Sequence, residues 1–249
     1  MKLLIDIGNT TTSAGLWKNG KLSMVNNSNN NKLFLTLKKY LKKEIDKILF
    51  TSVIGAKENK VIIDKLKKIY KCKARQIKSS SALLDVFNGY AQPQKLGDDR
   101  WVTIVASSLL YRKPLMIVDC GTAISIDMVN SKGIHLGGYI LGGFDGYSKS
   151  FKNAYHLKNI KTKEDPRSQK KCFPKKTEDA ITEGYLLMVI SAIESTYNQI
   201  KKNQKVFPEL LISGGYGKII STKLSIKNKY EPNLVLKSIG FIENQLQLK

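Results

Sequence analysis

Two distant segments of the sequence share one pattern, in which an apolar run ends at an aspartate that is followed by glycine and threonine. Leu4–Ser13 reads LIDIGNTTTS and Val118–Ser125 reads VDCGTAIS, with the second aspartate 113 residues beyond the first. Such a pattern is typical of a strand that enters a tight turn, whose backbone N–H groups can bind phosphate oxygens. An aspartate at that junction can hold a hydrated divalent cation. The repeat therefore predicts a duplicated, strand-rich unit with an anionic ligand held between the copies.

Strand and helix patterns elsewhere predict a mixed α/β fold. Strands are expected at 2–7, 13–17, 47–53, 74–77, 115–118, 125–129, 210–213 and 233–236, and helices at 33–43, 61–70, 101–110, 146–157 and 177–202. Asn19-Gly20 predicts a type I′ hairpin turn. The sequence between the two copies contains no low-complexity linker, so we expect closely packed domains at 1–113 and 114–249.

Two further segments are rich in residues that interrupt regular structure. Gly137–Gly143 (GGYILGG) contains too many glycines for the interior of a strand or helix, so we expect a turn where the backbone passes close to another group. Residues 159–176 are basic and contain Pro166 and Pro174, which predicts a mobile surface loop.

Charge is the most unusual property of the composition. The 42 basic and 20 acidic side chains give a net charge of +22, a value that nucleic-acid-binding proteins share. The basic residues are scattered and lack interleaved aromatic residues, which favours attraction of small anions over nucleic acid. The apolar share of 42% and the absence of any apolar run of about 18 residues predict a cytoplasmic globular protein.

Three cysteines, Cys72, Cys120 and Cys172, are widely spaced and form no CxxC pair, so we expect reduced thiols and no zinc site. Cys120 lies within the second turn, and we expect its side chain to point into the sheet.

The residues at the turns match the needs of phosphoryl transfer from ATP, which requires phosphate positioning, charge neutralisation and a base beside the acceptor hydroxyl. Asp6 is placed to orient a metal-bound water, and Asp119 with Thr122 repeats that arrangement. Gly214-Gly215, after a strand, would let a nucleotide lie against the backbone. The acids of Gly97–Arg100 stand at a helix start, where they fit either helix capping or catalysis.

Five motifs in order resemble those of the type III pantothenate kinases, which belong to the actin-like ATPase superfamily. The motifs are DIGNT at 6–10, GDDR at 97–100, DCGTA at 119–123, GGYI at 137–140 and SGG at 213–215. The resemblance implies two ribonuclease H-like (actin-like) subdomains with mixed sheets and an ATP cleft between them. It also implies a homodimer and ATP-dependent phosphorylation of pantothenate, the first step of coenzyme A biosynthesis.

The same resemblance assigns roles to individual residues. It implies that ATP is bound by Asp6, Ile7, Gly8, Asn9, Thr10, Thr11, Thr12, Ser13 and Thr122. It implies that Asp99 is the catalytic base and that pantothenate is bound by Tyr90, Gly97, Asp98, Asp99, Arg100 and, across the dimer interface, Thr177. Asp119 is expected to bind a monovalent cation such as K⁺ or NH₄⁺, and Asp6 to bind Mg²⁺ through water. From its chemistry alone, Arg100 suits the substrate carboxylate.

The chain departs from the family where Gly142-Gly143 replaces the usual Pro-Gly after the GGxI segment. Glycine keeps the turn possible but removes the rigidity of proline.

Two alternatives stay open on sequence grounds. A degenerate homologue acting as a nucleic-acid-binding or regulatory accessory protein would use the +22 charge and the altered GGxI loop. A pure binding protein, however, has no physical use for the full set of acids that the chemistry needs. A kinase of the same superfamily with another acceptor, such as a sugar, would keep those acids.

Overall fold

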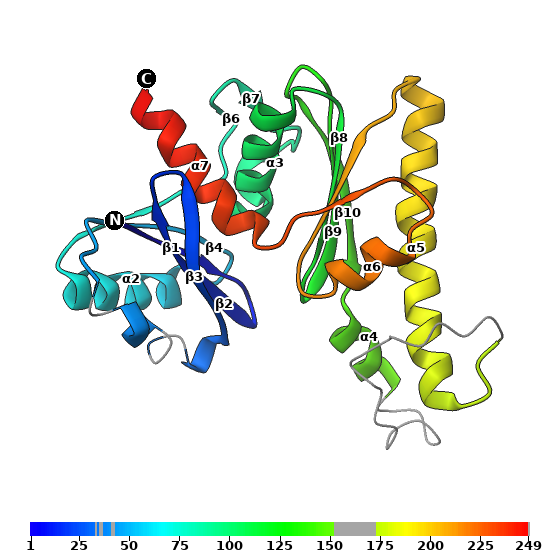
Figure 1. The fold of residues 1–249 in the computed structure, drawn as a ribbon, viewed down its shortest axis with the longest axis horizontal. Helices are drawn as coiled ribbons and strands as arrows, with labels where there is room; N and C mark the ends of the chain where they lie inside the picture. Colours follow the sequence, from blue (N-terminus) through cyan, green and yellow to red (C-terminus); the bar gives the residue numbers. More distant parts are fainter. Residues whose placement is uncertain (33, 35–36, 41–42, 152–172, 249) are drawn as a thin grey trace. The chain divides into compact units, whose positions relative to one another are not determined.

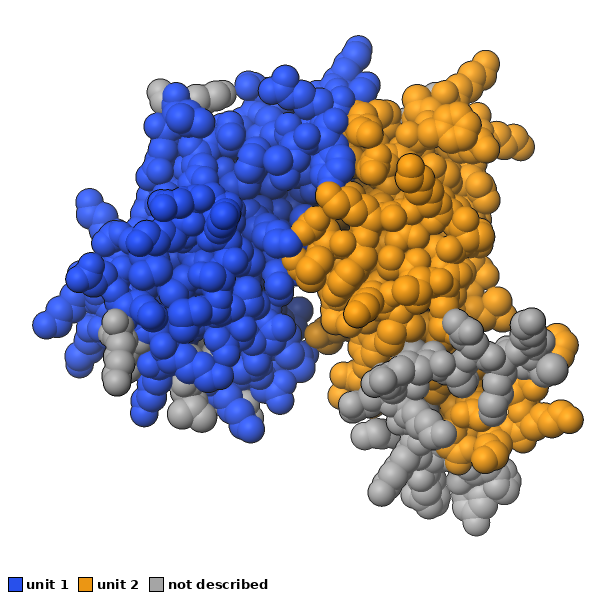
Figure 2. Space-filling model, in the orientation of Figure 1, with its two compact units in different colours: residues 1–112, 129–137, 233–249 blue, residues 113–128, 138–232 orange. Residues whose placement is uncertain are grey.

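The computed structural model describes residues 1–249 except 33, 35–36, 41–42, 152–172 and 249. The chain divides into two compact units (Figure 2). Unit 1 contains residues 1–112, 129–137 and 233–249, and unit 2 contains residues 113–128 and 138–232. The predicted domains at 1–113 and 114–249 each contain one of the two repeated turn motifs, and this division stays a proposal. The compact units also group residues 129–137 and the C-terminal segment with the N-terminal part.

A five-stranded sheet in the order β3-β2-β1-β4-β5 forms the centre of unit 1 (Figure 1). Its strands are β1 (Lys2–Ile7), β2 (Thr11–Lys18), β3 (Lys21–Asn29), β4 (Lys47–Ser52) and β5 (Lys73–Gln76). β1 to β3 pair antiparallel, and β4 lies parallel to both β1 and β5. Positive φ angles at Asn19 and Gly20 fit the predicted type I′ turn between β2 and β3.

Helices cover this sheet because its central strands are apolar on both faces. Ile5 and Phe50 share a buried cluster with Leu66 of α2 (Ala56–Tyr70). The opposite face, which includes the fully buried Leu4 and Leu49, packs against α3 (Asp98–Tyr111) and α7 (Leu234–Leu248). Strands β6 (Ala82–Leu83) and β7 (Val86–Phe87) form a two-stranded sheet in the connection that precedes α3. The short 3₁₀ helices of this unit include η1 (Asn30–Lys32), η2 (Lys38–Tyr40) and η3 (Pro93–Lys95).

Unit 2 repeats the order of the first sheet, as β10-β9-β8-β11-β12. Its strands are β8 (Leu115–Cys120), β9 (Ala123–Val129), β10 (His135–Gly142), β11 (Glu209–Ser213) and β12 (Lys229–Tyr230), with β8, β11 and β12 parallel. The helices are α4 (Phe144–Ser150), α5 (Thr177–Gln204) and α6 (Gly217–Lys223). The matching strand orders agree with the duplicated α/β unit predicted from the two turn motifs.

Two secondary-structure predictions are wrong. Gly137–Gly143 is no turn, because all but its last residue continue β10. The predicted close approach does occur at Gly138, where a Cβ atom would overlap the carbonyl oxygen of Ile126 on the neighbouring β9. Residues 233–236 are no strand, because α7 begins at Leu234. Short apolar runs do not distinguish a strand from a buried helix, and packing against the sheet and α3 decides the outcome.

The other predicted elements that the structure describes are present, with bounds that differ from the predicted ones by up to five residues. Thr177 is the first residue of the long helix α5, and Lys176 rather than Thr177 takes the N-cap position. The predictions for helix 33–43, for the helix beyond residue 151, for most of loop 159–176 and for Cys172 fall partly or wholly outside the described residues. Among the helices that are described, none combines the length and apolarity that crossing a membrane would need.

A buried carboxylate fastens α7 to the first sheet. The Glu243 side chain is 1% exposed and forms ion pairs with Lys2, Lys47 and Arg75 of three adjacent parallel strands. The Nζ atom of Lys47 lies 2.7 Å from Oε1 of Glu243. These three cations satisfy a charge that would otherwise be costly to bury.

Glu243→Gln should lower the free energy of unfolding by about 1.5–3 kcal/mol, since it removes charge-assisted hydrogen bonds from a buried position. Urea unfolding at neutral pH measures the change. Glu209→Gln is the matched control, because its partner Lys113 is 52% exposed. This substitution should lower the free energy of unfolding by less than about 1 kcal/mol. Equal effects of the two substitutions would contradict the role of Glu243.

Candidate active site

The first turn joins β1 to β2 and is held by side chains from elsewhere in unit 1. The hydroxyl of Thr51 donates to Oδ1 of Asp6 at 2.9 Å, so β4 orients this carboxylate at the end of β1. Asn30 donates to the carbonyl oxygens of Gly8 and Asn9 at 2.8 and 3.1 Å. Its Oδ1 accepts from the hydroxyl of Thr12 at 2.7 Å. The motifs give no sign of this role of Asn30, because it depends on contacts 18 to 22 residues away.

The predicted ATP-binding residues of this turn differ in what they expose. Asn9, Thr10 and Thr11 are exposed, whereas Ile7 and Thr12 are buried and offer only their backbone to a ligand. The Gly8 N–H donates to the carbonyl of Thr11 at 3.0 Å and closes the turn, and Ser13 is half-buried on β2. The exposed N–H and hydroxyl groups suit phosphate oxygens.

The second turn, between β8 and β9 in unit 2, is packed against two glycine backbones. A Cβ atom on Gly143 would overlap the carbonyl of Thr122, and one on Gly214 would overlap the backbone of Cys120. The Tyr216 N–H donates to the Cys120 carbonyl at 3.2 Å. Asp119 is half-buried at the end of β8 and Thr122 is exposed.

The departure from the family's Pro-Gly is sterically mild. Gly143, at the position where the resemblance places the family's glycine, cannot carry a side chain. Gly142, which replaces the proline, has no atom within 4 Å of where a Cβ would lie. The close packing at this turn is therefore retained.

Cys120 points into the core of unit 2, as predicted, and is fully buried there. Burial raises the pKa of its thiol far above the ordinary range, and the nearby Asp119 charge acts in the same direction. The thiol stays protonated and is unsuited to nucleophilic chemistry.

The four residues of GDDR start α3, with Gly97 at the N-cap. Asp98 accepts hydrogen bonds from Nε2 of Gln76 at 2.7 Å and from the Ser79 N–H at 2.8 Å. Gln76 in turn accepts from Asn59 of α2 at 3.0 Å. The carboxylate of Asp98 is thus engaged within the protein, joining β5 and the following connection to the start of α3.

Asp99 is the carboxylate at this helix start whose surroundings disfavour its charge. Burial raises the pKa of Asp99 above its ordinary value, opposed by the hydrogen bond and positive charge of Arg100. The charge of Asp98 raises it further. A Cβ on Gly97 would lie 2.5 Å from Oδ1 of Asp99, so glycine makes room for this carboxylate. Both capping and catalysis remain compatible with its place in the first turn.

Tyr90 contacts Arg100, the residue that follows Asp99 in the first turn of α3. Nη1 of Arg100 donates to the Tyr90 hydroxyl at 3.0 Å, and the guanidinium carbon lies 5.5 Å from the ring centroid. The Tyr90 N–H donates to Oδ1 of Asn88 at 3.0 Å. Asn88 also donates to Ser79 and Pro93, so it fixes the connection that carries Tyr90. Asn88 lies outside the motifs, so its role is not predicted from the sequence.

Thr177, the remaining predicted substrate residue, is exposed at the first position of α5 in unit 2. Its predicted contact with pantothenate across a dimer stays a proposal.

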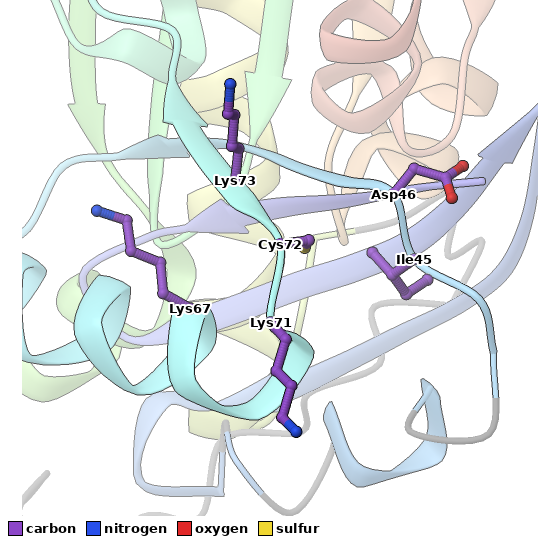
Figure 3. Close-up of a pocket in the computed structure, with 6 residues that line it drawn as sticks. All are labelled: Ile45, Asp46, Lys67, Lys71, Cys72 and Lys73. Atoms are coloured by element: carbon purple, nitrogen blue, oxygen red, sulfur yellow. The ribbon is translucent and has the colours of Figure 1, made fainter.

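An open hollow of about 590 Å³ lies at the other end of the unit 1 sheet (Figure 3). It is lined by Ile45, Asp46, Lys67, Lys71, Cys72 and Lys73, which flank the amino ends of β4 and β5. Asp6, Thr51 and Gln76 instead lie at carboxyl ends of strands, where α/β sheets usually bind ligands. The lysine side chains point in different directions (Figure 3), so they do not converge on one anion.

Across the part of the chain that the structure describes, no three His, Cys, Asp or Glu side chains gather into a metal site. A carboxylate outside such a cluster, as Asp6 is, fits a Mg²⁺ ion held mainly by phosphates and water.

Comparisons with known proteins agree with the resemblance to the type III pantothenate kinases. The family model for type III pantothenate kinase matches residues 2–199. The type III pantothenate kinase of Persephonella marina is 30% identical over 252 residues, which cover 96% of each chain. That of a Sulfurihydrogenibium species is 28% identical over 256 residues, covering 98% of this chain and 99% of its own.

Solved structures resemble the fold at lower identity. A Campylobacter jejuni protein assigned to the Baf family of transcriptional activators has a TM-score of 0.65 and 21% identity, covering 99% of this chain and all of its own. A Listeria monocytogenes protein described as an N-acetylmannosamine kinase has a TM-score of 0.53 and 11% identity, with 99% of both chains covered. These likenesses and the two mixed sheets confirm the predicted actin-like α/β fold class.

The family model spans most of the sequence, these two relatives align nearly end to end, and three of the five motifs (DIGNT, DCGTA and GDDR) fold into two turns and a helix start as expected; the chain belongs to the type III pantothenate kinase family.

Proposed function

We propose that this protein phosphorylates pantothenate with ATP to give 4′-phosphopantothenate, the first step of coenzyme A biosynthesis. The observation that carries the proposal is the half-buried Asp99 at the start of α3, next to Arg100 and Tyr90, in a chain of this family. A sugar would use the hydroxyl-directed base equally well but has no carboxylate for the Arg100 cation to bind. The nucleic-acid-binding alternative has the net charge of +22 and the altered GGxI loop in its favour, and neither gives Asp99 a use.

Asp99 is the general base of the proposed reaction. Its carboxylate accepts the proton of the pantothenate hydroxyl as that oxygen attacks the γ-phosphorus of ATP. The raised pKa makes Asp99 a stronger base than an ordinary aspartate. Gly97 leaves space beside this carboxylate.

Arg100 binds the pantothenate carboxylate, since a guanidinium group can donate two parallel hydrogen bonds to it. Tyr90 holds Arg100 through its hydroxyl. Asp98 supports the site from within the protein, through Gln76 and Ser79. Holding the carboxylate at a fixed place orients the hydroxyl at the other end of the substrate toward Asp99.

The ATP phosphates bind the turn at residues 6–13 through its backbone N–H groups and exposed hydroxyls, and Thr122 contributes a further contact. Asp6, oriented by Thr51, would hold Mg²⁺ through water, and the ion would supply charge neutralisation at the phosphates. Asp119 would hold a monovalent cation, K⁺ or NH₄⁺, at the end of β8.

The enzyme acts as a homodimer in this proposal. Leu187 and Met188 on α5 are 67% and 43% exposed, although most apolar residues of that helix are buried. A second copy would cover these side chains, and Thr177 at the start of the same helix would reach the partner's pantothenate.

Purified protein with ATP, Mg²⁺, K⁺ and pantothenate should form ADP and 4′-phosphopantothenate, and Asp99→Asn should lower kcat by at least about 10²-fold because it removes the base. Asp64→Asn, an exposed change on α2, is the control and should leave turnover unchanged. Product formation is followed by mass spectrometry and a coupled ADP assay, with and without the monovalent cation. Folded wild-type protein that forms no phosphopantothenate with either K⁺ or NH₄⁺ would refute the proposal.

The same substitution has a predictable effect on stability. A folded-state pKa above the unfolded value means that stability is lost as pH rises through the folded pKa, since the folded protein resists ionisation of Asp99. At neutral pH Asp99→Asn should therefore unfold at the same or a higher urea concentration than wild type, which separates loss of the base from loss of the fold.

Leu187→Glu should convert a dimer into a monomer, because it buries a charge in the proposed α5 interface. Light scattering coupled to size exclusion measures the mass against the 28.0 kDa chain. Val61→Glu on α2, where the apolar side chain is 53% exposed, should leave the mass unchanged. A wild-type protein that is monomeric at micromolar concentration would contradict the homodimer.

A further inference from the structure

We propose that His135 is a positioning residue of the acceptor site, whose imidazole ring fixes Tyr90 and, through it, the guanidinium group of Arg100. The inference rests on the proposed function in assigning Arg100 to the substrate carboxylate. Neither the motifs of the sequence nor the pairing of Tyr90 with Arg100 assigns a role to His135.

The two rings stack within unit 1. Their centroids lie 5.7 Å apart and their planes differ by 19°. His135 is 1% exposed, so solvent cannot replace it against Tyr90. A buried, nearly parallel neighbour restricts the side-chain torsions of a tyrosine more strongly than water does.

The backbone around His135 is fastened to the segment that carries Tyr90. The Phe87 N–H donates to the Gly133 carbonyl at 2.9 Å, and Phe87 forms a parallel bridge with Ile134. Gly89 has no room for a side chain, because a Cβ there would overlap the His135 carbonyl. The hairpin tip at residues 129–137 therefore holds the imidazole at a fixed place beside residue 90.

Tyr90 is thereby fixed at three points. Asn88 accepts its backbone N–H at 3.0 Å, His135 stacks on its ring, and Nη1 of Arg100 donates to its hydroxyl at 3.0 Å. Without the imidazole, the ring would gain freedom, and Arg100 would lose a fixed acceptor. Preorganisation of this kind lowers the entropy that binding must overcome.

His135→Ala should raise the KM for pantothenate about three- to tenfold, the range expected for loss of one aromatic contact. Because His135 is expected to act on binding of the acceptor alone, kcat and the KM for ATP should change less than about twofold. His135→Phe, which keeps a flat ring, should restore most of the affinity. Leu136→Ala, at the next position and 44% exposed, is the matched control and should have no effect.

A double-variant cycle tests whether His135 acts through Tyr90. In a Tyr90→Ala background the His135→Ala substitution should leave the KM for pantothenate where Tyr90→Ala alone puts it. Multiplicative effects, or an unchanged KM in the single His135→Ala variant of an active enzyme, would overturn the proposal while leaving the kinase function intact.

A measurement that needs no substrate separates the positioning role of His135 from the proposed kinase function. Fluorotyrosine placed at position 90 should give one sharp ¹⁹F resonance in the wild type and in His135→Phe, and a shifted or broadened one in His135→Ala. An unchanged resonance would overturn the positioning role whatever the acceptor is. Absence of pantothenate turnover together with the expected ¹⁹F change would refute only the proposed function.

Discussion

The hydrogen bonds of Asp98 are the constraint on which the acceptor site depends. Its carboxylate joins Gln76 at the end of β5 to the backbone of Ser79 and to the first turn of α3. The next two residues along that turn are Asp99 and Arg100, so the anchor fixes the proposed base and the proposed carboxylate-binding cation together. A helix start also presents N–H groups that favour negative charge, which offsets part of the cost of burying Asp99.

The rest of unit 1 supports this helix start from several directions. Asn59 of α2 hydrogen-bonds Gln76, and α7 packs against α3 while Glu243 fastens α7 to the sheet. The site thus rests on rigid elements rather than on a free loop, which suits chemistry that needs the base and the hydroxyl at a fixed distance. In the proposed mechanism, the unfavourable burial of Asp99 is a local cost that makes it a stronger base.

Much of the fold and site could be predicted from sequence because the informative patterns are local. The apolar run before Asp6 and its repeat before Asp119 predicted two strands with turns, and both are present. The GGYI segment and residues 233–236 were misassigned, because edge-strand pairing and packing against α3 override local composition. Asn30, Asn88 and His135 were given no role because their contacts connect residues distant along the chain, which one sequence does not reveal.

The central claim is that Asp99 takes the proton of the acceptor, and the pH dependence of kcat/KM for pantothenate tests it most directly. Protonation removes the base, so kcat/KM should fall as pH decreases through the raised pKa of Asp99. The acidic limb should lie above the ordinary aspartate value of about 3.9, and an NMR titration of pantothenate's own carboxyl in the same buffer identifies the substrate's contribution. A limb that only follows the substrate carboxyl, or activity that stays constant down to that pH, would contradict the account.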